Sequence, residues 1–173
     1  MAQIKNKDIE MLKKVLASVV LAVGFANAGA ILPNDELQLG LLAQNARAKM
    51  IVLANMHLKG DQKKKFGDLY DEYQKELVKL RVKRVNIIKD YAKNFKDMND
   101  KNADKILSEW MQTQKDELAI KEKYVEKFKK ILPSSLVLRF YQIENRLNIR
   151  REANIASMLP LAIPDQNSKK IKK

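Results

Sequence analysis

The longest regular pattern of apolar and polar positions runs from residue 62 to residue 95. Apolar side chains recur there at steps of three and four residues, which places them on one side of an α-helix. The segment contains no proline and a single glycine, Gly67. A helix of this length would be roughly 50 Å long at 1.5 Å per residue, too long for the middle of a compact small domain. The pattern therefore predicts a rod, and its main stripe is formed by Phe66, Leu69, Tyr70, Tyr73, Leu77, Leu80, Ile87, Ile88, Tyr91 and Phe95.

Three shorter helices are expected to lie along this rod. The first should begin at Glu36, with Asp35 as its N-cap and Gln38 in the capping-box position, and continue to about Met56. The long helix should open at Gly60 or the residue after it.

Turn chemistry at residues 97–102 separates the long helix from the next one, which is expected over residues 103–131. The last helix should cover residues 134–158, because Pro133 suits a first turn and Pro160 ends the pattern. The fold class that follows is all-α, an elongated antiparallel helical hairpin of four helices with one long central helix.

The long helix also has a second apolar face, here called the valine face, which consists of Val78, Val82, Val85 and Ala92. It lies roughly 120° around the helix from the main stripe. Two apolar faces require two neighbours, and internal packing of both is the simpler interpretation. The alternative is a partly open face that binds a partner, because a thin hairpin has few elements with which to cover both faces.

Arg84 stands in the middle of the main stripe, where a leucine would be expected. A buried guanidinium needs a carboxylate or several carbonyls around it. If residues 99–102 form the turn of an antiparallel hairpin, Glu117 faces Arg84 and is its predicted partner. Gln114 and Glu144 are the substitutes. Such a pair is interpreted as a structural element that fixes the register rather than as a ligand site.

Residues 1–28 have the pattern of a signal peptide. Two lysines precede an apolar run at 15–25 that is too short to span a bilayer, and the small residues around Ala28 and Ala30 fit signal-peptidase cleavage. An uncleaved anchor or the first core helix of a cytosolic protein are the alternatives. The order of charge, apolar run and small residues favours export to the periplasm, with cleavage after Ala28 or Ala30.

The remaining chain is expected to form a single all-helical domain at 29–164, followed by a disordered basic tail at 165–173. Cysteine is absent, so disulfides and thiolate chemistry are excluded. His57 is the only histidine, which leaves too few ligands for a metal site. The sequence contains no phosphate-binding glycine loop, and we expect neither an enzyme nor a cofactor.

The formal net charge of +13 indicates anionic partners. The lysines of the long helix alternate with acidic residues, whereas a nucleic-acid site would be more segregated. The expected partners are therefore unfolded or acidic proteins, or one envelope protein. A weak contact with anionic membrane surfaces is compatible with the lysine run 63–65 and the C-terminal lysines.

Two short segments at expected helix starts carry a resemblance. Residues 58–62, Leu-Lys-Gly-Asp-Gln, resemble the L-T-x-x-Q element of the Spy/CpxP family of periplasmic stress proteins, with Leu58 and Gln62 matching and lysine in place of the threonine. Residues 132–136, Leu-Pro-Ser-Ser-Leu, form a more degenerate copy. The segment 132–164 is also similar to a poorly characterised group of exported helical proteins related to that family.

The resemblance implies a Spy-like curved helical hairpin, often a homodimer, that binds unfolded proteins without ATP as part of a stress response. The alternative is a regulatory or structural protein that docks one envelope partner. Metal-binding members of the family use histidines that this chain lacks. On the chaperone hypothesis, the expected client surface is the valine face with its cationic edge: Val78, Arg81, Val82, Val85, Lys89 and Lys96.

Overall fold

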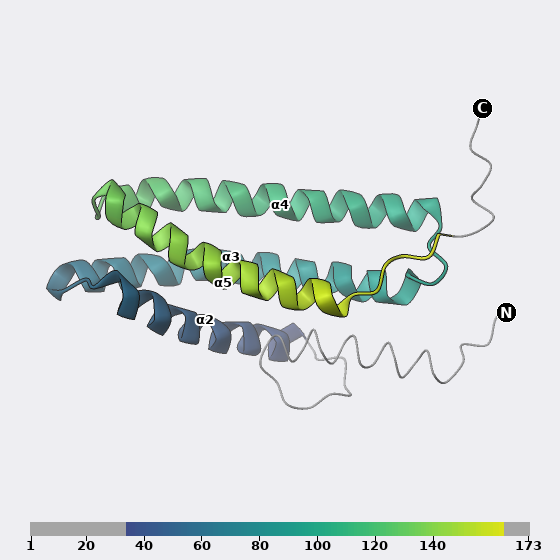
Figure 1. The fold of residues 1–173 in the computed structure, drawn as a ribbon, viewed down its shortest axis with the longest axis horizontal. Coiled ribbons are helices and arrows are strands. Elements are labelled where there is room, and N and C mark those ends of the chain that lie inside the picture. The colour runs from purple at the N-terminus through teal and green to yellow at the C-terminus, as the bar shows by residue number, and fades with distance from the viewer. Residues whose placement is uncertain (1–33, 165–173) are drawn as a thin grey trace.

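A computed structural model describes residues 34–164, with side chains from residue 40 onward. It contains four helices in antiparallel succession: α2 (Asn34–Met56), α3 (Gly60–Asn94), α4 (Asp100–Lys129) and α5 (Ser134–Met158). The prediction of an all-α fold of four antiparallel helices is confirmed (Figure 1). The expected signal peptide and basic tail lie outside the described residues.

The 35-residue helix α3 is the long helix that the main stripe predicts. It pairs with α4 as a hairpin, while α2 lies along its other side and α5 crosses between α2 and α4 (Figure 1). Eight of the ten main-stripe residues are buried, and the other two, Leu69 and Tyr91, are partly buried. The stripe therefore forms the axis around which the other helices pack.

The helix boundaries agree with the sequence pattern except at two starts. Helix α4 begins three residues before the expected position, because the Asn99 side chain caps it by accepting a hydrogen bond from the Asn102 backbone N–H at 2.9 Å. Helix α2 begins at Asn34, so Asp35 lies within the helix rather than before it. Helix α5 begins after Pro133 and ends at Met158, as predicted.

The main core lies at the end of the molecule where the α2–α3 and α4–α5 turns meet (Figure 1). Leu58 and Leu132, the first residues of the two L-T-x-x-Q-like segments, are both buried in it. Six rings from three helices fill its centre, with centroid separations as short as 4.6 Å between Phe128 and Phe140. This aromatic core consists of Phe66, Tyr70, Tyr73, Tyr124, Phe128 and Phe140.

The segment after α5 returns to the opposite end of the molecule and is hydrogen-bonded to the α3–α4 turn. Tyr91 Oη donates to the Pro160 carbonyl at 2.5 Å. The backbone N–H of Ile163 donates to Phe95 O at 2.6 Å, and that of Met98 donates to Ile163 O at 3.0 Å. These contacts hold residues 160–164 against the tip of the hairpin.

Candidate functional site

Helix α2 packs on the central part of the valine face. Val78 and Val85 are buried, at 6% and 8% exposure, and pack with Leu41 of α2, while Val82 lies at the edge of this cluster. Val78 and Val85 are therefore packed internally, whereas Val82 at the edge stays partly exposed. The physical reason is that α2 runs antiparallel along α3 over this face, a placement that no local pattern in the sequence specifies.

Helix α2 divides the expected client surface between two hollows. Val78 and Val82 line a groove on one side of α2, and Arg81 and Val85 line a smaller cavity on the other. Of the remaining two residues, Lys89 is half-buried and Lys96 is exposed beyond the end of α3. Neither of these lysines lines the groove or the cavity, so the six residues do not form one surface.

The first hollow, here called the lysine groove, lies between α2 and α3 and has a volume of about 780 Å³. Its charged residues are Lys49, Lys75, Lys79 and Asp71, of which Lys49 and Asp71 form an ion pair at 2.6 Å. Within residues 40–164, neither Lys75 nor Lys79 has a carboxylate partner. The uncharged residues of the lining are Leu42, Asn45, Ala46, Tyr70, Gln74, Val78 and Val82.

Two buried amide side chains in the lysine groove each have one unpaired atom. Asn45 is 6% exposed; its Oδ1 accepts a hydrogen bond from Arg81 at 2.5 Å, but its Nδ2 has no partner. Gln74 is 3% exposed; its Nε2 donates to Glu144 at 3.2 Å, but its Oε1 has no partner. A buried polar atom without a partner costs about 1–3 kcal/mol. Both atoms have less than 1 Å² of exposed surface, so they lie beneath the lining of the groove and are not open to a ligand.

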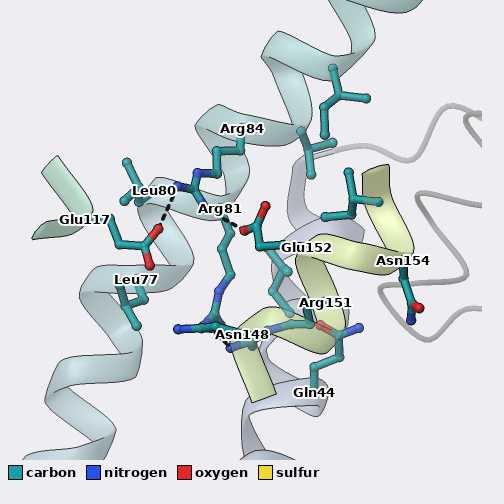
Figure 2. A pocket seen from close by; sticks show the side chains of 14 residues that line it. Gln44, Leu77, Leu80, Arg81, Arg84, Glu117, Asn148, Arg151, Glu152 and Asn154 are labelled. Atoms are coloured by element: carbon teal, nitrogen blue, oxygen red, sulfur yellow. Dashed lines mark hydrogen bonds and ion pairs between the residues drawn. The ribbon is translucent and has the colours of Figure 1, made fainter. Parts of the chain in front are cut away.

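The second hollow, here called the arginine cavity, lies between α2, α3 and α5, with Glu117 of α4 at its wall, and has a volume of about 80 Å³. Figure 2 shows Arg81 running through its centre, with Arg84 above it and Arg151 entering from α5. Leu41, Leu77, Leu80, Val85, Ile88 and Ile155 supply its apolar wall. Three guanidinium groups from two helices therefore share one largely apolar enclosure.

The predicted ion pair of Arg84 and Glu117 is present, with Nη2 and Oε2 2.6 Å apart and each side chain 16% exposed. Glu152 of α5 adds a second carboxylate at 2.9 Å, a partner that sequence reasoning missed because the crossing of α5 was not predictable (Figure 2). The ring of Trp110 lies 5.8 Å from the Arg84 guanidinium. The three helices α3, α4 and α5 are thus joined through one arginine.

Glu144, a proposed substitute partner of Arg84, has a different role. It is 3% exposed, and its Oε1 accepts hydrogen bonds from Tyr70 Oη at 2.7 Å and from Gln74 at 3.2 Å. Burial, together with the Glu144 charge and its hydrogen bond, raises the pKa of Tyr70. Glu144 therefore ties α5 to α3 beneath the groove and does not reach Arg84.

The structure also describes the residues that carry the family resemblance and those that could bind a metal ion. Gln62 is partly buried in the first turn of α3, and Lys59 at the N-cap makes no side-chain capping hydrogen bond. Among the described residues, no group of three or more carboxylates and histidines is arranged to hold a metal ion. None of the four helices combines the length and the hydropathy needed to cross a membrane.

Comparisons with known proteins give no relative. No protein-family model, no curated protein and no solved structure matches this chain. The resemblance to the Spy/CpxP family therefore stays a hypothesis based on two short motifs, and the function has to be argued from the two hollows.

Proposed function

We propose that the protein is an exported binding protein that holds unfolded, acidic protein segments in the lysine groove without ATP, as a Spy-like chaperone would. The observation that carries this proposal is that one groove combines a largely apolar lining with a lysine rim, which is formed by Lys75 and Lys79. The function is binding and not catalysis, in the periplasm to which the N-terminal pattern would direct the chain.

An unfolded chain has the complementary chemistry. It exposes apolar side chains beside charged ones, so one segment can place apolar groups in the groove and carboxylates at the lysine rim. A folded protein has already buried most of its large apolar side chains. The groove therefore favours unfolded over folded chains for a physical reason.

The lysine rim adds charge selection. Lys75 and Lys79 are exposed and flank Val78 on α3, so carboxylates on either side of an apolar client segment would meet them. Such attraction accelerates encounter and weakens with salt, which gives a reversible grip without nucleotide hydrolysis.

The test is suppression of aggregation of a chemically denatured acidic client at low salt. Lys75→Glu/Lys79→Glu should raise the concentration needed for half-maximal protection about fivefold or more, because two rim charges become repulsive. Lys63→Glu/Lys64→Glu is the matched control, since it makes the same charge change at exposed positions on the same helix. Failure of the wild-type protein to protect the client, or an equal loss in both variants, would overturn the groove assignment.

The alternative, docking of one envelope partner or of a second copy, has support in a different surface. Leu107, Met111 and Leu118 of α4 are 57%, 52% and 56% exposed, and their spacing places them on the outer face of that helix. A homodimer would use this face rather than the valine face, where α2 packs on Val78 and Val85.

Light scattering on the purified protein tests this arrangement. If α4 joins two copies, Leu107→Lys/Leu118→Lys should convert a dimer into a monomer, because charges replace the apolar contact. If the wild-type protein is monomeric at all concentrations, this face does not join two copies, and it binds another partner or none. A pull-down then separates one stoichiometric partner from many clients.

A further inference from the structure

The charges around the arginine cavity are unevenly balanced. Arg84 is held by two carboxylates at 2.6 and 2.9 Å. The Arg81 guanidinium donates instead to the neutral amide of Asn45 at 2.5 Å, and Arg151 donates to the neutral amide of Asn148. Within residues 40–164, no carboxylate forms an ion pair with Arg81 or Arg151.

The remaining charged groups near Arg81 do not remove this imbalance. Burial and the positive charge of Arg151 lower the pKa of Arg81 to about 10, while Glu144 opposes the shift. The Oε1 atom of Glu144 accepts from Tyr70 and Gln74, and its buried Oε2 has no hydrogen-bond partner, so Glu144 acts on Arg81 through its charge and not through a direct ion pair. Two neighbouring guanidiniums of this kind are stabilised by an anion that both can contact.

The size and wall of the cavity restrict which anion fits. A volume of about 80 Å³ leaves room for roughly five to eight water molecules. Leu77, Leu80 and Ile155 line the same space as the two arginines. A bare inorganic anion would leave this apolar wall uncovered, whereas a long acyl chain would exceed the volume.

We propose that the arginine cavity binds a carboxylate carried on a short branched apolar group, with the carboxylate between Arg81 and Arg151 and the apolar group against Leu77, Leu80 and Ile155 (Figure 2). Two sources present this chemistry: a free short-chain acid and the last residue of a peptide that ends in leucine or valine. The site lies on the opposite side of α2 from the lysine groove and does not depend on client binding there.

Calorimetric titration of the full chain with four probes tests the proposal. The probes are sodium isovalerate, its neutral analogue isovaleramide, and a short peptide ending in leucine with either a free or an amidated C-terminus. We expect binding of isovalerate, of the free-carboxylate peptide, or of both, and none of either amide. Binding of the acid alone identifies a small-molecule site, and binding of the peptide alone identifies a site for chain ends.

Variants of α5 locate the site. Arg151→Gln should weaken binding about tenfold or more, because it removes one charge-assisted hydrogen bond to the carboxylate. Arg150→Gln is the matched control, since the neighbouring arginine is exposed and does not line the cavity. Thermal unfolding of both variants checks that they are folded. Absence of binding by every probe, equal binding of acid and amide, or equal affinities of the two variants would overturn the assignment.

Discussion

Replacing Phe140 with alanine should lower the free energy of unfolding by about 3–5 kcal/mol, the largest effect expected for a single substitution in this chain. Phe140 is 1% exposed and is the α5 ring of the aromatic core. Its centroid lies 4.6 Å from that of Phe128 and 5.3 Å from that of Phe66. Truncation would leave a cavity that rigid rings on α3 and α4 cannot fill.

The matched control is Leu138→Ala on the same helix. Leu138 is 61% exposed, so its truncation removes little buried area and should change stability by less than about 0.5 kcal/mol. Urea unfolding followed by circular dichroism measures both variants, and the slope of the transition shows whether the unfolded surface has changed. Equal midpoints for Phe140→Ala and Leu138→Ala would mean that α5 does not pack on the aromatic core as described.

Replacing Arg84 with methionine should lower the free energy of unfolding by about 2–3 kcal/mol. Breaking a buried ion pair by removing one partner costs about 3–5 kcal/mol. The expected value is lower here, because Arg84 is 16% exposed and Glu117 keeps its ion pair with Lys121 at 2.5 Å. Loss of the contact with Trp110 adds to the effect.

The control for Arg84 is its neighbour on the same helix. The Lys83 side chain is 67% exposed and lies 3.8 Å from Asp116, so Lys83→Met removes the same charge with a change below about 0.5 kcal/mol. The double variant Arg84→Met/Glu117→Leu should be more stable than the sum of the two single changes predicts, since neither partner is left unpaired. Additive effects would show that the two residues are not coupled.

The pH dependence of stability provides a second measurement on the Arg84–Glu117 ion pair. Burial opposes ionisation of Glu117, but the hydrogen bond from Lys121 and the charge of Arg84 lower its pKa overall. A carboxyl group whose pKa is lowered in the folded state stabilises the fold above its unfolded pKa of about 4.3, and that contribution is lost as the pH falls through the folded pKa. The stability difference between wild type and Glu117→Gln should therefore shrink from about pH 7 to about pH 3.

The hairpin at the centre of this fold could be predicted because its determinants are local. The spacing of the main stripe identifies α3, and the turn at residues 97–102 fixes how α4 comes back along it. Together they place Glu117 opposite Arg84, and the structure shows that ion pair at 2.6 Å. The same logic gives the start of α5 at Pro133, since proline suits a first helical turn and disfavours a helix interior.

The candidate sites could not be predicted in the same way, because they depend on where α2 and α5 cross α3. The sequence by itself determined four helices, their order, the buried stripe and its one internal arginine, all of which follow from helical periodicity and short-range turn chemistry. Only the tertiary structure decided that α2 packs on Val78 and Val85, that Glu152 joins Arg84, and that the groove and the cavity lie on opposite sides of α2. The physical reason is that helix packing depends on how side chains of different helices fit together. A periodic apolar face shows that a helix packs against something, but it does not show which helix is the partner.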